Sequence, residues 1–501
     1  MDIKDKKFWI PFLGKWFAIS FFIHFICSIF NMGFYHFDEH YQILEYLHVK
    51  LKGISPDYLP WEYGHKMRSW TQPGLYFLIA KFLGFFGMEN PFNLAFVFRF
   101  FTSMTGWFSL CTLSLSLFFL FKEDVQRKWG VIFLTLVWYI PFIQTRPSSE
   151  GLGSNVFILG LSMMVWGLMR KKSFGVFPFY LALMSGVLFG LSFTFRFQLG
   201  ILVMFVWLWA ILIGKIRITS AMAMVAGIVS MILVEVLVDY WGYGEWTFVP
   251  YNYLYQNLVL DKVSGFGKDP WWQYFKISFT KGIPPISILL IFSQVLFWIK
   301  RKSQLLTWST LPLFLIHTMI SHKTIRFIFP VALLAPLTLL ELPALLKLSR
   351  DFFQKKWVKN IACGLMAINL LVLLVVSLKP AQRGVVMYKD IYNNRDKIKK
   401  IYYRDNWSLH SFVGLPQRYY RSEDLITSID KPDKNEKEYW YFVRGLHFLE
   451  ESGYESFMRD GFFCELAYST HPLFLLKMKI GNWPRRTNVW GLYLCKNKMN
   501  K

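Results

Sequence analysis

Charged residues are scarce in this chain, and acids are the scarcer kind. Asp, Glu, Lys and Arg make up only 18% of the 501 residues, whereas a soluble domain averages about 25%. Hydrophobic residues make up 54%, and the mean hydropathy is +0.32. The apolar residues fall into runs of about 16–28, the length that crosses a bilayer as a helix. The sequence therefore predicts a multi-pass membrane protein and not a soluble globule.

Cysteine is also rare, with five residues, and no Cys-x-x-Cys pair or cysteine cluster has the spacing of a metal site. Cys27, Cys111 and Cys363 lie in apolar segments, where we expect them to act as packing residues. Cys464 and Cys495 lie in the polar C-terminal part. Those two can form a disulfide if that part faces an oxidising compartment, and the sequence leaves this open.

A cleavable signal peptide is not evident. The first apolar segment, residues 8–34, is longer than the hydrophobic core of a signal peptide and lacks a small-residue cleavage site. We therefore expect it to be an uncleaved first span.

Apolar segments predict the membrane domain. The candidate spans are residues 9–31, 74–88, 92–121, 129–145, 152–169, 174–194, 198–214, 218–238, 284–299, 304–320, 326–346 and 358–378. Because 74–88 is short, we expect it to be interfacial or re-entrant, which leaves about 11 spans, or 12 if it crosses. The sequence thus predicts a transmembrane domain over residues 1–378 and a soluble, mixed C-terminal domain over residues 379–501.

The basic residues indicate how these spans are oriented. The formal net charge is +24, which in a soluble protein would suggest nucleic-acid binding. Here many Lys and Arg lie in short loops between apolar runs, where they set topology and contact anionic lipid. We expect no nucleic-acid partner and place these loops in the cytoplasm. The opposite, outer face then carries residues 33–73, 146–151, 195–197, 239–283 and 321–326 and the C-terminal domain.

Two adjacent acids follow the first span, in the stretch "HFDEHYQ" at residues 36–42. A partly buried carboxylate at the membrane–water boundary can act as a general base on a hydroxyl, which makes Asp38 and Glu39 candidate catalytic residues. The alternative is a pair of solvated acids that cap the next helix. A metal site is disfavoured, because two His and two acids so close in sequence seldom bind one ion.

Several cations on the outer face are not explained by topology. Arginine's planar fork suits phosphate, although Arg146 and Glu150 in "TRPSSEG" can instead form an ion pair in a tight turn. A cation within an apolar stretch, or on the outer side, favours an anionic ligand. The candidates for binding a phosphate are Arg146, Arg196, His322, Lys323 and Arg326.

Aromatic residues are dense in the two long outer loops, at residues 33–73 and 239–283. Such residues often form an interfacial belt, and they can also stack on a sugar ring. A loop of about 40 residues between spans favours a functional role. Together, the acids, cations and aromatics on one face fit glycosyl transfer from a lipid-phosphate sugar.

Five ordered motifs resemble glycosyltransferase family 22 of the GT-C superfamily, the polyprenyl-phosphate-mannose-dependent α-mannosyltransferases. "HFDE" followed by Gln42 resembles the family's His-Pro-Asp-Glu motif, and "WEYG" at Trp61–Gly64 matches its Trp-Glu-Tyr-Gly. "TRPSSEG", "DYWGYGEWTFVPYNYLYQN" and "SHKTIRFIFP" resemble three further motifs, and "QRG" at Gln382–Gly384 resembles the branch that adds the third mannose of a glycosylphosphatidylinositol (GPI) anchor. Phe37 replaces Pro and Thr324 replaces Glu, which leaves the acceptor and the exact sugar open.

The resemblance implies an all-helical GT-C fold and an inverting transfer of mannose, or a related sugar, from a polyprenyl phosphate to a glycan or glycolipid. Asp38 would be the general base and Glu39 would orient the acceptor, while the cations, above all His322 and Arg326, would neutralise the leaving phosphate. It implies neither a cofactor nor a dedicated metal site. The residues expected to bind acceptor or sugar are His36, Gln42, Trp61, Glu62, Tyr63, Gln198, Tyr243, Trp246 and Asn252.

Two alternatives stay open. One is a GT-C transferase for another lipid-linked sugar, and the other is a lipid or glycan transporter. A transporter more typically has repeated halves and charges near mid-span, whereas here the charges lie at span ends. Frequent Lys, Phe and Trp and the absence of long insertions favour a bacterial relative. That places the site and the C-terminal domain in the periplasm, or in the endoplasmic reticulum lumen if the protein is eukaryotic.

Overall fold

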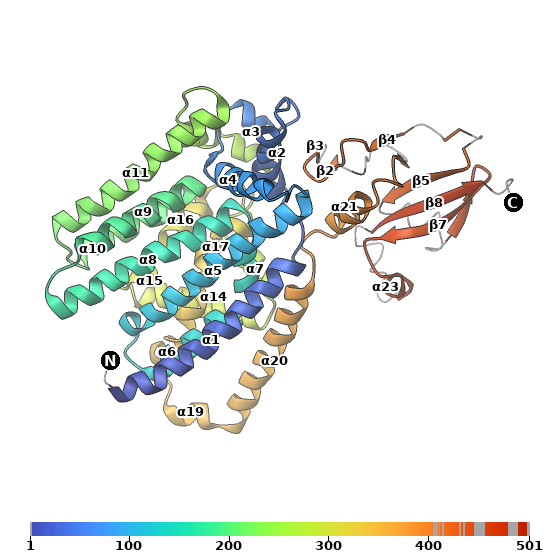
Figure 1. Cartoon of the computed structure of the whole chain (residues 1–501). Coiled ribbons are helices and arrows are strands. Elements are labelled where there is room, and N and C mark those ends of the chain that lie inside the picture. The colour runs from blue at the N-terminus through green and yellow to red at the C-terminus, as the bar shows by residue number, and fades with distance from the viewer. Residues whose placement is uncertain are drawn as a thin grey trace. The chain divides into compact units, whose positions relative to one another are not determined.

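Helices dominate the first four fifths of the chain, and strands follow in the C-terminal part (Figure 1). The computed structural model describes residues 3–403, 409, 411–412, 415–429, 432–433, 436–444, 456–478 and 489–497. The helical first part and the strands that follow it confirm the predicted fold class, a helical membrane protein with a small mixed C-terminal region.

The chain divides into two compact units. The first unit comprises residues 1–31, 61–82 and 96–379. The second comprises residues 32–60, 83–95 and 380–501. The acidic stretch at 36–42 therefore groups with the C-terminal region, although it was placed with the membrane domain on sequence grounds.

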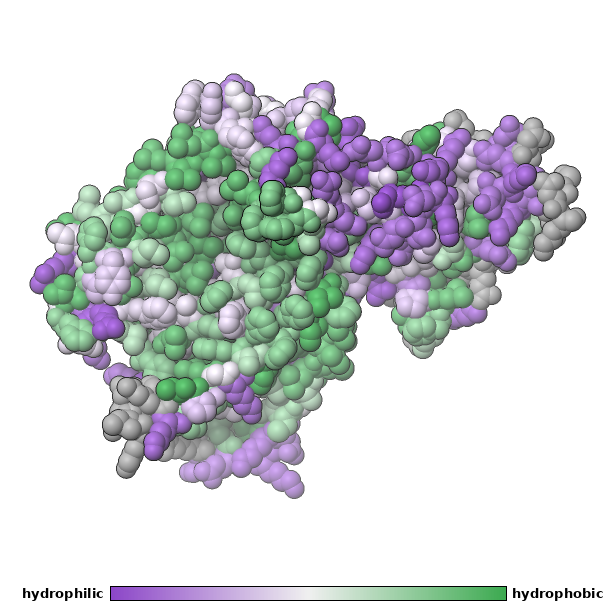
Figure 2. Space-filling view, viewed as in Figure 1, coloured by the Kyte–Doolittle hydropathy of each residue, from purple (hydrophilic) through white to green (hydrophobic). Residues whose placement is uncertain are grey.

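Long apolar helices form the frame of the first unit. Within the described part of the chain, five helices are long and apolar enough to cross a membrane. They are α1 (Ile3–Phe30), α5 (Pro91–Leu120), α8 (Ser149–Phe174), α11 (Ile218–Tyr243) and α20 (Lys356–Leu378). The space-filling view shows apolar residues over much of this helical part and hydrophilic residues over the C-terminal strands (Figure 2).

Shorter helices complete the first unit, and several are interrupted. The segment predicted as 129–145 splits into α6 and α7 around Val137, whose backbone is extended. The segment 74–88 forms α4, of 15 residues, which at about 1.5 Å per residue is shorter than a bilayer core. The remaining elements are α3 (Trp61–Gly64), α4 (Thr71–Phe85), α6 (Asp124–Leu136), α7 (Tyr139–Thr145), α9 (Phe179–Phe195), η2 (Phe197–Leu199), α10 (Gly200–Leu212), α12 (Val249–Leu254), η3 (Tyr255–Val259), η4 (Lys262–Phe266), α13 (Gln273–Lys281), α14 (Ile286–Lys300), α15 (Leu305–Trp308), α16 (Leu311–Met319), η5 (Ile325–Ile328), α17 (Phe329–Leu339), α18 (Leu342–Leu345) and α19 (Arg350–Gln354).

Small residues let α9 and α11 pack closely. A Cβ added to Gly186 would lie 2.1 Å from the carbonyl oxygen of Met224, and one added to Gly227 would lie 2.6 Å from the carbonyl oxygen of Leu183. Such close backbone approach is typical of helix pairs in membranes. At its C-terminal end α9 stops at Phe195, and the chain turns at Arg196 into η2.

The second unit contains a six-stranded mixed sheet in the order β4-β1-β5-β8-β7-β6. β1 pairs in parallel with β4 and β5, and the other neighbours are antiparallel. The described elements are η1 (His40–Leu44), α2 (Glu45–Lys52), α21 (Gly384–Asn393), β1 (Lys400–Tyr403), β2 (Ser411–Phe412), β3 (Leu415–Pro416), β4 (Ile426–Ser428), β5 (Glu438–Arg444), β6 (Ser456–Arg459), β7 (Phe462–Ser469), α23 (Leu473–Lys477) and β8 (Trp490–Asn497).

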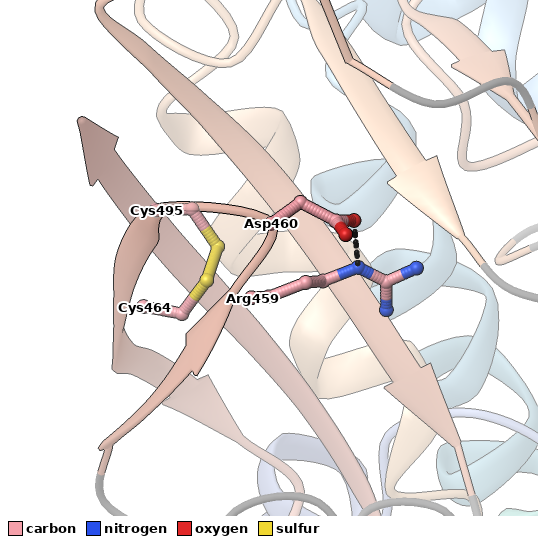
Figure 3. Close-up of a disulfide and its surroundings, with 4 residues drawn as sticks. All are labelled: Arg459, Asp460, Cys464 and Cys495. Carbon is pink, nitrogen blue, oxygen red and sulfur yellow. Dashed lines mark ion pairs between the residues drawn. A yellow bond between two sulfur atoms is a disulfide. The ribbon is translucent and has the colours of Figure 1, made fainter. Parts of the chain in front are cut away.

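A disulfide joins two neighbouring strands of this sheet. Cys464 of β7 lies opposite Cys495 of β8, and the two sulfur atoms are bonded (Figure 3). An ion pair between Arg459 and Asp460 lies nearby in the same view, with a nitrogen–oxygen distance of 3.7 Å. The structure thus contains the pairing that the sequence left open.

Removing the disulfide should destabilise this sheet. The double variant Cys464→Ser, Cys495→Ser opens a loop whose ends are 31 residues apart, which should lower the free energy of unfolding by about 3 kcal/mol. Denaturant-dependent proteolysis of the full chain measures this loss. The exposed Cys363 provides the control, since Cys363→Ser should behave as wild type. Equal stability of the double variant and wild type would contradict the prediction.

Candidate active site

The chain leaves α1 through a turn that only glycine accommodates. Gly33 has a φ of +87°, and a Cβ there would lie 2.7 Å from the Cβ of Gln382. The adjacent carbonyl of Met32 accepts hydrogen bonds from the N–H groups of Ala381 and Gln382. The start of the acidic stretch is therefore tied to the "QRG" segment, which the sequence singled out separately.

The two adjacent acids have different surroundings within the second unit. Glu39 is buried, and its Oε1 accepts hydrogen bonds from the N–H groups of Tyr35 (3.2 Å) and His36 (3.3 Å). Asp38 lies beside His36, with 3.5 Å between its Oδ1 and the imidazole Nδ1, and its own N–H donates to that nitrogen. Glu39 thus stabilises the turn through main-chain hydrogen bonds, and the Asp38 carboxylate lies next to the imidazole of His36.

A π-helical turn, η1, follows directly and buries all five of its residues, Gln42 among them. Such turns are rare and often occur at functional sites. Because η1 begins at His40, the residue after Glu39, the backbone of η1 sets the position of the turn that carries Asp38 and Glu39.

In the first unit, one carboxylate gathers cations from distant segments. Glu150 lies in the first turn of α8, and its Oε1 accepts from Arg326 Nη1 at 2.9 Å and pairs with Arg196 Nη2 at 3.1 Å. All three side chains are buried. The structure therefore brings together residues of the segments 146–151, 195–197 and 321–326, and with them two of the predicted phosphate-binding residues.

The pKa of the Arg196 guanidinium lies below its ordinary value. Burial lowers its pKa, Glu150 opposes this, and the like charges of Arg68 and Arg326 lower the pKa further. A buried cluster of like charges is costly unless anions compensate it. Such a site is suited to binding an additional anionic group.

A polar chain leads from Arg196 to residues that sequence analysis missed. Arg196 Nε donates to Gln198 Oε1 at 3.1 Å, and Gln198 Nε2 donates to the Tyr253 hydroxyl at 2.9 Å. The Arg68 guanidinium lies over the Tyr253 ring and pairs with Glu62 at 2.6 Å. Gln198 and Glu62 were predicted to bind sugar, and the structure shows them holding Arg196 and Arg68.

Tyr243 and Asn252, also predicted to bind sugar, hold a neighbouring loop. The Tyr243 hydroxyl donates to the carbonyl of Arg68 at 2.7 Å, and Asn252 Nδ2 donates to the carbonyl of Lys66 at 3.1 Å. Asp239 Oδ1 accepts from the N–H of Trp70 at 2.7 Å. These three residues therefore fix the backbone of the loop that carries Arg68.

The aromatic candidates lie around the same loops. Tyr63 faces the ring of Tyr243 at 5.3 Å. Trp246 is 66% exposed and stacks on Tyr240, and the Lys262 ammonium lies over the half-exposed ring of Trp61. Exposed rings of this kind are available to stack on a sugar, and that role stays a prediction.

Of the other predicted cations, Lys323 and Arg146 donate to main-chain carbonyls, whereas His322 lies near a carboxylate. Lys323 Nζ donates to the carbonyls of Asp269 (3.0 Å) and Ile320 (2.6 Å). His322 Nδ1 lies 4.0 Å from a carboxylate oxygen of Asp269. Arg146 is fully buried and donates to the carbonyl of Asn31 at the end of α1. Lys323 and Arg146 thus join segments of the unit, in addition to any part in binding.

Two buried polar groups near the arginines have no hydrogen-bond partner among the described residues. They are the hydroxyl of Tyr274, which interacts electrostatically with Arg326, and Nε2 of His317, which interacts with Arg196. Buried polar atoms normally have a partner. These unsatisfied groups fit a site that receives an oxygen-rich ligand.

A model of the Alg9-like mannosyltransferase family matches residues 15–410. The chain belongs to this family. Among characterised relatives, the Mannosyltransferase APTG1 of Arabidopsis thaliana is 27% identical over 301 residues, which is 59% of this chain and 52% of that protein. The GPI alpha-1,2-mannosyltransferase 3 of Bos taurus is 26% identical over 302 residues, with the same coverage of 59% and 52%. The chain thus matches about half the length of these relatives.

The fold of this Alg9-like family member also has a solved counterpart. ArnT from Cupriavidus metallidurans superposes with a TM-score of 0.50 at 12% identity, over 98% of both chains. This likeness shows the fold alone, and it confirms the predicted GT-C architecture. The chain accordingly combines a GT-C-type fold with membership of a mannosyltransferase family.

Residues that sequence analysis of this family member missed share one property, which is that their partners are distant in the chain. Glu45, Arg68, Asp239, Tyr253 and Tyr274 are ordinary residue types, and only their contacts with distant segments single them out. Asp239 and Tyr253 do lie within the long motif "DYWGYGEWTFVPYNYLYQN", which was the one available signal. Among the described residues, no group of three or more His, Cys, Asp or Glu side chains is placed to hold a metal ion.

Proposed function

We propose that this protein transfers mannose from a polyprenyl phosphate to a hydroxyl of a glycan or glycolipid acceptor, with inversion, on the outer face of the membrane. The observation that carries the proposal is the buried Glu150 carboxylate shared by Arg196 and Arg326. Guanidinium groups held rigidly in a buried site are suited to stabilising the charge that develops on a departing phosphate.

The reaction is a single displacement. The acceptor hydroxyl oxygen attacks C1 of the mannose, the bond from C1 to the phosphate oxygen breaks, and the prenyl phosphate leaves with that electron pair. Asp38 takes the proton of the acceptor hydroxyl, and Glu39 holds the turn that carries Asp38. A single base suffices, because a phosphate leaves without needing a proton.

The cations divide into two groups in this proposal. Arg326 and Arg196 bind the donor phosphate directly, and His322 lies on the same outer segment as Arg326. Lys323 and Arg146 brace the site through the carbonyls that they contact. The exposed rings of Trp61 and Trp246 are proposed to contact the sugar or the acceptor.

We also propose which side of the membrane these features face. If the short basic loops lie in the cytoplasm, as the positive-inside rule predicts, the polar motifs and the C-terminal region face the periplasm or the endoplasmic reticulum lumen. The disulfide between Cys464 and Cys495 supports this placement, because disulfides persist in oxidising compartments.

Donor selection tests the proposal. The purified full chain in detergent should transfer mannose from polyprenyl-phosphate mannose to a mannose-containing glycolipid and release prenyl phosphate in equal amount. GDP-mannose should support no transfer. Transfer from GDP-mannose alone would overturn the proposal. Faster transfer from another lipid-linked sugar would redirect it to the alternative sugar, which the departures at Phe37 and Thr324 leave open.

A further inference from the structure

Two buried ionisable side chains lie directly behind the acidic turn. His40 begins η1 and Glu45 begins α2, and both are fully buried. Oε1 of Glu45 lies 2.6 Å from Nε2 of His40. Neither residue has a role in the proposed chemistry, so their burial needs another explanation.

The same oxygen of Glu45 also contacts the C-terminal region. It accepts hydrogen bonds from the main-chain N–H groups of Arg418 at 2.8 Å and Tyr419 at 3.0 Å. One carboxylate oxygen therefore collects an imidazole and two backbone donors, which belong to two segments far apart in the sequence. Hydrogen bonds to a charged acceptor are among the stronger ones in proteins.

Further contacts join these two segments within the second unit. The Tyr41 hydroxyl donates to the carbonyl of Leu415 at 2.6 Å. The ring of His40 stacks on Tyr420 with a centroid distance of 5.6 Å and an interplanar angle of 22°. Residues 415–420, which we call the support segment, thus contact both consecutive residues that open η1, His40 and Tyr41.

Glu45 keeps its charge in this environment. Burial alone would raise its pKa, but the interactions with His40, the N–H of Tyr419 and His48 outweigh burial, and the pKa lies below its ordinary value. The ionised carboxylate is the form that accepts all three contacts. A neutral side chain would accept these contacts more weakly, and a shorter one would leave buried donors without an acceptor, which is costly.

The acids are continuous with this anchored turn. The N–H groups of His40 and Tyr41 both donate to the carbonyl of Phe37, at 3.0 Å each. Asp38 and Glu39 are the two residues enclosed by these bonds. A displacement of His40 or Tyr41 is therefore transmitted to Asp38 through two hydrogen bonds and the connecting backbone.

We propose that Glu45 is a positioning residue, which fixes the turn bearing Asp38 by anchoring it to the support segment of the C-terminal region. The C-terminal region is then part of the active-site scaffold and not a separate appendage. The inference rests on the proposed role of Asp38 as the base, and it deepens that role by naming what aims the carboxylate.

The test compares Glu45→Gln and Tyr41→Phe with wild type in the full-length protein. Small displacements of a catalytic group cost up to about a hundredfold in rate. We expect Glu45→Gln to lower kcat about 10- to 100-fold and Tyr41→Phe severalfold, with the KM for the polyprenyl-phosphate donor changed less than about twofold. Glu423→Gln is the matched control, because Glu423 is an exposed carboxylate of the same region paired with Lys52, and it should behave as wild type.

Hydrogen–deuterium exchange separates this inference from the proposed function, since it needs no turnover. Glu45→Gln should speed exchange in residues 36–44 and in the support segment, and Glu423→Gln should not. Unchanged exchange, unchanged kcat, or a loss of donor affinity as large as the loss of kcat would each overturn the positioning role. If Glu45→Gln fails to fold, Tyr41→Phe decides by the same readouts. If wild type shows no transfer from the lipid donor, the proposed function fails, and exchange alone decides the scaffold role.

Discussion

Replacing Asp38 with asparagine should lower the rate of mannose transfer by about a thousandfold. Asparagine has nearly the same shape but cannot accept the proton of the attacking hydroxyl, and general-base catalysis contributes about 10²–10⁴-fold. The turn should survive, because its bracing bonds come from Glu39 and from the main-chain N–H of residue 38. Initial rates with saturating polyprenyl-phosphate mannose measure the effect.

The matched control for Asp38→Asn is Asp57→Asn, in the same unit. Asp57 is an exposed acid whose side chain contacts only Ser55 among the hydrogen bonds described, so its variant should retain wild-type turnover. Donor binding should be equal in all three proteins. An Asp38→Asn protein that is folded and turns over at a near wild-type rate would show that Asp38 is not the base.

The second large effect is expected for Arg326→Ala. This variant removes one of the two guanidinium groups held by the buried Glu150, and with it a donor that we propose for the leaving phosphate. Loss of one such preorganised donor typically costs about 10²–10³ in rate. We expect kcat/KM for the lipid donor to fall by that factor, while the KM for the acceptor stays near its wild-type value.

Arg127→Ala provides the control for a lost arginine. Arg127 pairs with the exposed Asp124 in α6 and donates to the carbonyl of Phe121, and neither contact involves a residue proposed for the site. Its variant should show wild-type kinetics. If Arg326→Ala instead raises the KM for the acceptor and leaves donor use intact, Arg326 belongs to the acceptor site and not to the phosphate site.

Much of the membrane domain could be predicted from the sequence, because apolar runs of sufficient length have few alternatives to a helix. The long helices α1, α5 and α20 follow their predicted segments closely. The interruption at Val137 has a local signal in the sequence, which is Pro141 in α7. A proline cannot donate a hydrogen bond to the carbonyl four residues earlier, here that of Val137, and its ring clashes with that carbonyl in a helix.

The candidate site was also predictable only in part, because some of its residues stand out locally and others have partners far away in the chain. Arg196 and Arg326 were identified because cations are unexpected in their positions. Their shared partner is Glu150, which lies 176 residues from Arg326, and no local pattern indicates such a contact. The structure pairs Glu150 with Arg196 and Arg326, and the Arg146–Glu150 pair that the sequence offered stays a prediction.

Glu45 shows most clearly that contacts between distant segments cannot be predicted from the local sequence. In the sequence it is one acid near the start of a short helix, and a solvated helix-capping role would be the ordinary interpretation. Its burial and its bonds to Arg418 and Tyr419 depend on chain segments more than 370 residues apart. The prediction of a separate C-terminal domain over 379–501 likewise had no means to include residues 32–60.

The anomeric configuration of the product tests the proposed single displacement most directly. Purified protein would be given a β-linked polyprenyl-phosphate mannose and a glycolipid acceptor, and the new linkage would be assigned by NMR. One displacement at C1 inverts the configuration, so an α-linked mannose is predicted. A β-linked product would contradict the mechanism, because retention requires a second displacement and a nucleophile on the enzyme.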